Sequence, residues 1–251
     1  MNRRIIPRLE VKSRKLIKGI RMEGLRVVGD PLESIIKYYE GGADEIIYDD
    51  IVASLYDRKY DVEFINELSN NIFIPFCVGG GVKNIDDIHE LLNAGADKVA
   101  INTHAVKNPN LIYEASRIFG SQCVVTEIQA KRQRKNCWEA YTESGRERHN
   151  LDAIEWAKKA EELGSGEILL LSVDNDGLKC GPDIELIKSI KSTVSIPVIA
   201  GGGIGRLGHI SDIINITKAD AISISNCLHF ESLNIKTIKS HLSKESIEVR
   251  I

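Results

Sequence analysis

The sequence contains the same pattern twice, about 120 residues apart. PFCVGGGV at 75–82 corresponds to PVIAGGGI at 197–204, and each is followed by an Ala-Asp pair and another apolar run, AGADKVAIN at 94–102 and KADAISIS at 218–225. GGADEII at 41–47 likewise resembles GSGEILL at 164–170. Self-similarity at a fixed spacing indicates a repeated structural unit. We therefore expect a single domain over 1–251, built from two halves at about 1–120 and 121–251.

Short apolar runs alternate with amphipathic stretches along the whole chain, a pattern typical of β-α units with parallel strands. Strands are expected at 4–10, 45–50, 75–79, 98–102, 123–129, 167–172, 197–201 and 221–225. Helices are expected at 31–42, 60–71, 84–94, 108–119, 150–164, 183–192, 207–217 and 231–243. Eight units in about 250 residues predict an α/β fold, a closed (β/α)8 TIM barrel made of two half-barrels. The alternative is a doubly wound open sheet, but no GxGxxG follows the first strand to favour it.

Composition excludes several classes of protein. With 43% hydrophobic residues and a net charge of -3, the chain is neither disordered nor a general nucleic-acid binder. It has no apolar run of about 18 residues, and its N-terminus lacks the apolar segment of a signal peptide, so we expect a cytoplasmic protein. The five cysteines form no CxxC and the six histidines lack ligand spacing. We therefore expect free thiols and no metal.

Two glycine triplets, 79–81 and 201–203, each end a predicted strand. Without side chains, their backbone N–H groups can approach an anion closely, at the barrel face where ligands bind. Polar residues follow at the next strand ends, Asn102-Thr103 in one half and Ser225-Asn226 in the other, and the 174–177 turn adds Gly177. The paired arrangement predicts two phosphate sites and hence an elongated bisphosphate across the barrel mouth.

These motifs, with RRIIPRLEVK at 3–12, EIQAKR at 127–132 and GEILLLSVDNDG at 166–177, resemble the cyclase subunit of imidazole glycerol phosphate synthase from end to end. The resemblance implies a lyase of histidine biosynthesis that needs no cofactor. A partner glutaminase would form a heterodimer with it and supply ammonia. The cyclase would use that ammonia to convert a bisphosphate ribonucleotide into imidazole glycerol phosphate and an aminoimidazole carboxamide ribotide.

The resemblance also assigns roles to residues. It places the two phosphate sites on Gly80, Gly81, Asn102 and Thr103 and on Gly177, Gly202, Gly203 and Ser225. It places the catalytic pair at Glu10 and Gln129, a further site residue at Asp176, and Lys18 in a basic loop, 12–29, that closes over the substrate. It makes Arg4, Glu45, Lys98 and Glu167 an ammonia gate at the barrel bottom, with Asp97 at the glutaminase interface.

Two features depart from the family. The catalytic pair is normally two aspartates, whereas Glu10 is one methylene longer and Gln129 cannot ionise. Strand alternation also points Arg8, Asp49 and Glu127 into the barrel, where the family has small or apolar residues. Because unpaired interior charges are costly, we expect these three side chains to form a compensated cluster.

These departures leave two other functions open. The chain could be a second, divergent paralogue that channels ammonia to a sugar amidination in surface-polysaccharide synthesis. It could also be a non-catalytic barrel that binds a bisphosphate.

Overall fold

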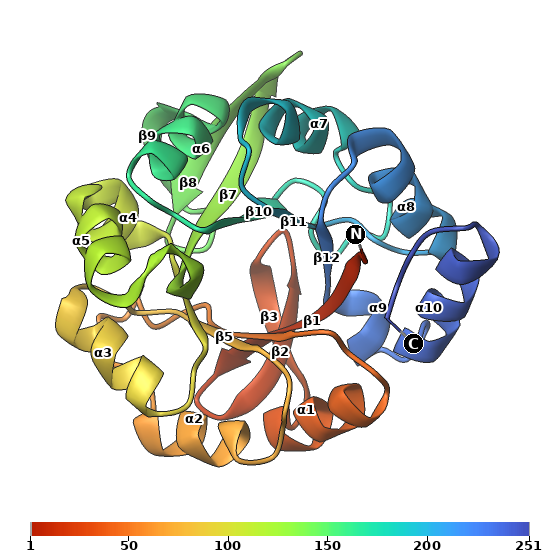
Figure 1. The fold of residues 1–251 in the computed structure, drawn as a ribbon, viewed down its shortest axis with the longest axis horizontal. Helices are drawn as coiled ribbons and strands as arrows, with labels where there is room; N and C mark the ends of the chain where they lie inside the picture. The colour runs from red at the N-terminus through yellow and green to blue at the C-terminus, as the bar shows by residue number, and fades with distance from the viewer. Residues whose placement is uncertain (1, 251) are drawn as a thin grey trace.

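In the computed structural model, which describes residues 2–250, eight parallel strands close into a barrel (Figure 1). The strands are β1 (Arg4–Lys12), β4 (Ile46–Asp50), β5 (Phe76–Gly79), β6 (Lys98–Ile101), β7 (Val124–Arg134), β10 (Glu167–Ser172), β11 (Val198–Gly201) and β12 (Ala221–Ile224). Each pairs with the next in this order, and β12 pairs with β1 to close the ring. The predicted (β/α)8 barrel is confirmed.

Helices surround the barrel on its outer side (Figure 1). They are α1 (Pro31–Glu40), α2 (Val62–Ser69), α3 (Ile85–Asn93), α4 (Thr103–Lys107), α5 (Asn110–Phe119), α6 (Ala153–Glu162), α7 (Ile184–Thr193), α8 (Leu207–Asp212), α9 (Asn226–His229) and α10 (Ile235–Lys244), with a 3-10 turn at Ser121–Cys123 and a π-helical turn at Ile213–Thr217. Two helices begin at side-chain caps: Asp30 accepts from the N–H groups of Leu32 and Glu33, and Asn84 from that of Asp87. No helix in the described range is long and apolar enough to cross a membrane.

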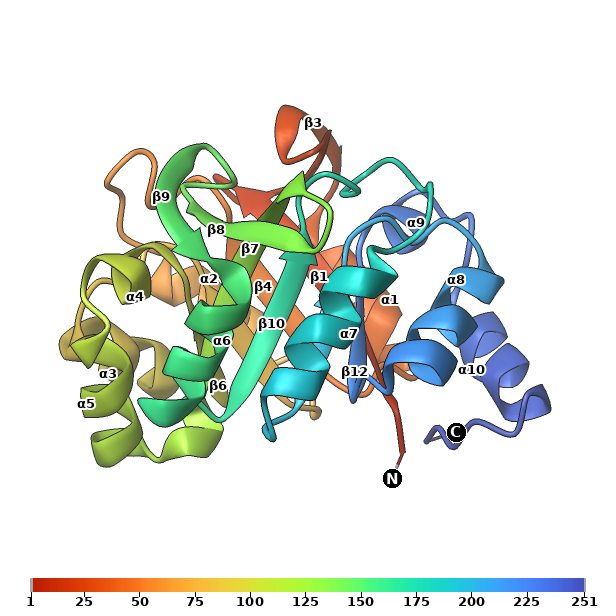
Figure 2. The same ribbon diagram turned by 90° about the horizontal axis from the view of Figure 1, so that it is seen from above.

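Two antiparallel insertions were not predicted. The segment expected to be a loop at 12–29 is a hairpin of β2 (Lys15–Ile20) and β3 (Glu23–Gly29), which pairs with the end of β1. The long β7 continues into β8 (Cys137–Thr142) and β9 (Glu147–Asp152). The helix expected at 150–164 therefore begins only at Ala153, capped by Asp152. Figure 2 shows both insertions on the same side of the barrel, above the carboxyl ends of the strands.

The repeated Ala-Asp motif ties neighbouring strands together. Asp97, just before β6, accepts a hydrogen bond from the N–H of Phe76 at the start of β5, at 2.9 Å. Asp220, before β12, accepts from Val198 of β11 at 2.9 Å, and Asp44, before β4, accepts from Ile5 of β1 at 2.8 Å. In GSGEILL the hydroxyl of Ser165 takes the same role, accepting from the N–H of Thr126 in β7 at 3.2 Å. Each contact satisfies a buried donor that the strand ladder leaves free.

Candidate functional site

The two glycine triplets have the same backbone conformation. Gly80 and Gly81 have φ of 97° and 75°, and Gly202 and Gly203 have φ of 96° and 84°, values that L side chains rarely adopt. A Cβ on Gly80 would lie 2.4 Å from the carbonyl oxygen of Asp50 at the end of β4. The turn geometry therefore requires glycine and repeats between the two halves of the chain.

Each triplet borders a small cavity at the carboxyl ends of the strands. One cavity, of about 30 Å³, is lined by Gly80, Gly81, Asn102 and Thr103, the group predicted for one phosphate, together with acidic residues of β4 and β7. The other, of about 20 Å³, is lined by Gly177, Gly202, Gly203 and Ser225, the group predicted for the second. The structure thus brings each predicted set together, and each cavity has room for about one water molecule.

The first cavity is more acidic than the second. Asp49, Asp50, Glu127 and Glu143 all line it, and Glu143 is a residue that sequence reasoning missed. Arg8 lines the second cavity, opposite Asp176. An anion would therefore meet mainly backbone and hydroxyl donors in the first cavity and a guanidinium in the second.

Between the two cavities, Arg8 is the centre of a buried ion network. Its Nη1 donates to Glu10 Oε1 at 2.7 Å and its Nη2 to Asp49 Oδ2 at 2.6 Å, while Glu127 Oε1 lies 3.6 Å from Nη2. Lys18 Nζ extends the network, bonding Glu10 Oε1 at 2.6 Å and both oxygens of Asp176. The predicted cluster of Arg8, Asp49 and Glu127 is present, and it is larger than expected because the hairpin brings Lys18 into it.

Carboxylates outnumber cations in this network, since Arg8 and Lys18 face Glu10, Asp49, Glu127 and Asp176. Burial and the charge of Asp49 raise the pKa of Glu127 to about 7, against the opposing effect of Arg8. Burial and Glu10 raise the pKa of Asp176, although Lys18 opposes this. Burial alone would lower the pKa of Lys18, but Glu10 and Asp176 raise it. Both cations are therefore held charged, and the surplus of buried carboxylates favours the protonated form of Glu127.

The predicted catalytic pair faces the barrel mouth from opposite halves of the chain. Glu10 is fully buried; its Oε1 is held by Arg8 and Lys18, and its Oε2 has no hydrogen-bond partner in the described part of the chain. Gln129 accepts from the N–H of Gly145 at 2.8 Å and donates through Nε2 to Glu127 Oε1 at 2.9 Å. The first position keeps a carboxylate with a free oxygen, and the second is a fixed amide.

Both insertions cover this region. At the turn of the β2–β3 hairpin, the backbone N–H of Arg21 donates to the carbonyl of Asp176 at 2.9 Å. Met22 is 1% exposed and packs in the apolar cluster that includes Leu171 and Val173. Lys18, expected in a basic loop over the mouth, is instead 3% exposed and fully paired. Neither Met22 nor the 143–146 turn carries a motif, so sequence reasoning missed both.

The four residues predicted at the barrel bottom form a closed ring of ion pairs. Arg4 pairs with Glu45 at 2.5 Å and also with Glu167. Lys98 Nζ lies 2.9 Å from each of the same two carboxylates. The two cations thus bridge both carboxylates, and the ring lies at the opposite end of the lumen from the glycine loops. The side chain of Asp97, next to the ring, accepts the hydrogen bond from the N–H of Phe76 at the start of β5.

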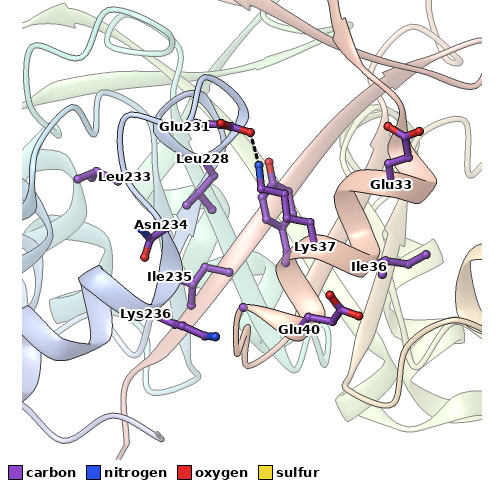
Figure 3. Close-up of a pocket in the computed structure, with 12 residues that line it drawn as sticks. Glu33, Ile36, Lys37, Glu40, Leu228, Glu231, Leu233, Asn234, Ile235 and Lys236 are labelled. Atoms are coloured by element: carbon purple, nitrogen blue, oxygen red, sulfur yellow. Dashed lines mark hydrogen bonds and ion pairs between the residues drawn. The ribbon is translucent and has the colours of Figure 1, made fainter.

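A larger cavity, of about 800 Å³, lies between α1 and the segment joining α9 to α10 (Figure 3). Its rim carries the Lys37–Glu231 ion pair, and Ile36, Leu228 and Ile235 line it. None of the predicted site residues lines this groove, which is formed by outer helices. This groove is therefore separate from the two glycine-lined cavities at the carboxyl ends of the strands.

Comparison with known proteins identifies the family. The histidine biosynthesis protein family matches residues 4–234. The chain belongs to this family. It is similar to proteins named imidazole glycerol phosphate synthase subunit HisF, with 47% identity to that of Hydrogenobaculum sp. (strain Y04AAS1) over 99% of both chains. Identity is 53% to that of Legionella pneumophila, over 82% of this chain and 97% of the relative, and 44% to that of Clostridium botulinum (strain 657 / Type Ba4) over both full chains.

The resemblance read from the motifs is confirmed by these matches. The relatives' shared name does not favour surface-polysaccharide synthesis or a purely binding role.

The raised pKa of Glu127 predicts a pH-dependent loss of stability. Folded, this carboxyl keeps its proton up to about pH 7; unfolded, it loses the proton near its ordinary value of 4.5. Between these values the folded chain binds more protons, so the free energy of unfolding falls as pH rises, by up to about 1 kcal/mol per pH unit. The loss is complete above pH 7.

Glu127→Gln removes this titration. In urea denaturation from pH 4.5 to 9, the variant should gain stability relative to the unsubstituted chain as pH rises through 7, and the difference should level off about one pH unit higher. Parallel stability curves for the two proteins would contradict the assignment.

Proposed function

We propose that this chain is the cyclase subunit of an imidazole glycerol phosphate synthase, an enzyme of histidine biosynthesis. It uses ammonia to convert a bisphosphate ribonucleotide into imidazole glycerol phosphate and an aminoimidazole carboxamide ribotide. The observation that carries the proposal is identity of 44–53% to relatives of that name over most or all of the chain. Two matching glycine-lined cavities at one face of the barrel support it, because the substrate has a phosphate at each end.

In this proposal each cavity receives one phosphate. The oxygens would accept hydrogen bonds from Gly81, Asn102 and Thr103 in the first cavity. In the second they would accept from Gly177, Gly203 and Ser225, with Arg8 adding positive charge. Backbone N–H groups near glycines with positive φ form concave anion sites of this kind.

Substrate entry requires the β2–β3 hairpin to move. Cavities of about 30 and 20 Å³ cannot admit a bisphosphate ribonucleotide while Met22 is buried in the mouth. Lifting the hairpin would also withdraw Lys18 from Glu10 and Asp176, leaving carboxylates without their cation. Nitrogen donors of the bound substrate would then replace Lys18 as hydrogen-bond partners of these carboxylates. The hairpin would close over the substrate once it is bound.

We further propose that a glutaminase docks at the opposite end of the barrel and delivers ammonia through the ring of Arg4, Glu45, Lys98 and Glu167. The ring lies across the lumen, and its members are 1–26% exposed at the side chain, so it is partly open to the outside. Asp97 beside it would form part of the docking face. The complex would act in the cytoplasm, where histidine is synthesised.

The activity itself is directly measurable. The purified chain with ammonium and the bisphosphate ribonucleotide should release both products without any glutaminase. Thr103→Val and Ser225→Ala each remove one hydroxyl donor to a phosphate and should each weaken substrate binding about tenfold, measured by calorimetry. Ser195→Ala, at the opposite end of the barrel, is the matched control and should bind normally. Absence of product from the unsubstituted chain would refute the proposal.

The gate is tested by uncoupling. Lys98→Ala leaves Arg4 as the sole cation of the ring against Glu45 and Glu167, so the ring should loosen. In the reconstituted complex, the ratio of product formed to glutamine hydrolysed should fall, while turnover with external ammonium should stay nearly unchanged. A lower melting temperature with the ratio unaltered would mean that the ring only stabilises the barrel.

A further inference from the structure

The residue in the second catalytic position cannot transfer protons, and its amide is locked in one orientation. The N–H of Gly145 is only a donor, so the atom of Gln129 that it contacts at 2.8 Å is the carbonyl oxygen Oε1. The amide nitrogen therefore points the other way, toward Glu127 Oε1 at 2.9 Å. The β8–β9 turn thus orients the Gln129 amide through Gly145, and the amide in turn orients the carboxyl of Glu127.

Glu127 lies beside Gln129 in the lumen and, unlike Gln129, carries a group that can transfer protons. It lies two residues earlier on β7, so its side chain points into the same lumen. It is 4% exposed and lines the first glycine cavity together with Gly81 and Thr103. On its other side are the apolar residues of β10, where Leu169 is its register partner. Its carboxyl therefore faces the space between the lumen below and the proposed phosphate site above.

We propose that Glu127 is the catalytic proton-transfer residue of this half of the barrel and that Gln129 is its positioning residue. The inference rests on the proposed function and moves the second member of the acid/base pair one layer deeper into the barrel. Glu10, with its free Oε2, remains the first member.

The proton step is balanced without any further reactant. When the nitrogen of ammonia attacks an unsaturated carbon of the substrate, the double bond at that carbon opens and its electron pair moves to the atom at the other end of that bond. The attacking nitrogen then carries an extra proton, which passes to a carboxylate oxygen of Glu127. When the adduct collapses, the double bond re-forms from that electron pair and the carbon–nitrogen bond to the departing aminoimidazole breaks; the leaving nitrogen takes the electrons of the broken bond and the proton that the Glu127 carboxylic acid returns. The residue ends each cycle as it began.

The charges around Glu127 suit both halves of this cycle. Asp49 on β4 and Glu10 on β1 favour the protonated form, while Arg8 on β1 and the amide of Gln129 favour the ionised form. Lys18 of the hairpin acts only at a distance, through Glu10. With a pKa of about 7, Glu127 has both forms available near neutral pH, which is the condition for efficient general acid–base catalysis.

The test compares two buried glutamates under the same substitution. Glu127 and Glu139 are each 4% exposed, but Glu139 on β8 pairs with Arg148 and does not line the cavity. Glu127→Gln should lower turnover by about 10²- to 10⁴-fold, with substrate affinity changed only a few-fold. Glu139→Gln should retain turnover. Rates are measured with external ammonium from pH 5.5 to 9 at constant free ammonia, so that ionisation of ammonium itself does not shape the profile.

The pH profile separates catalysis from structure. The unsubstituted chain and Glu139→Gln should show a rate that rises through about pH 7, where Glu127 becomes ionised, and this rise should be absent in Glu127→Gln. Glu127→Gln with turnover within threefold of the unsubstituted chain, or with the rise still present, would overturn the inference.

A second variant serves if Glu127→Gln does not fold. Gln129→Met removes the hydrogen bond that favours ionised Glu127, so the rise should move to higher pH, and an unmoved rise would overturn the inference. If the unsubstituted chain forms no product at all, the proposed function fails and this inference with it. If that chain is active and Glu127→Gln matches it, only this inference fails.

Discussion

The site depends on the buried ion pairs that the guanidinium of Arg8 forms with Glu10 and Asp49. This guanidinium lies in the lumen at 1% exposure, where an unpaired charge would be prohibitively costly. Its bonds to Glu10 and Asp49 fix the carboxyl groups of two strands, and through Glu10 they bring in Lys18 and the hairpin. This network joins the β2–β3 hairpin and the carboxyl groups of Glu10 and Asp49 into one electrostatic unit.

The network also suits the role proposed for Glu127. Two cations cannot fully neutralise four buried carboxylates, and burial together with the charge of Asp49 raises the pKa of Glu127 to about 7. A glutamine at position 129 adds no further charge and gives Glu127 a fixed hydrogen bond. An aspartate at 129 would instead place a second carboxylate beside it. The uncharged amide at 129 and the proton-transfer role proposed for Glu127 are therefore physically linked.

Sequence analysis predicted the fold and the site composition because both depend on local repetition. The period of the β-α units predicted all eight barrel strands, and the glycine triplets predicted the two loops whose positive φ values they alone accommodate easily. The β2–β3 hairpin was missed because the two-residue turns at its ends lack the usual glycine signal: Ser13-Arg14 and Arg21-Met22 adopt positive φ without any glycine. Strand alternation placed Arg8, Asp49 and Glu127 in the lumen, but Lys18 could join them only through a hairpin that the pattern did not reveal.

Burial and the neighbouring carboxylates raise the pKa of Glu127 to about 7, so a substantial fraction of this carboxyl still carries a proton at neutral pH. Carbon-13 NMR of the chain labelled at the glutamate side-chain carboxyls measures this directly, with Glu127→Gln identifying the resonance by its disappearance. We expect a titration midpoint near pH 7 for Glu127 in the folded protein. A midpoint near the ordinary value of 4.5 would show that the surroundings of Glu127 do not raise its pKa, and the electrostatic role assigned to the lumen would be wrong.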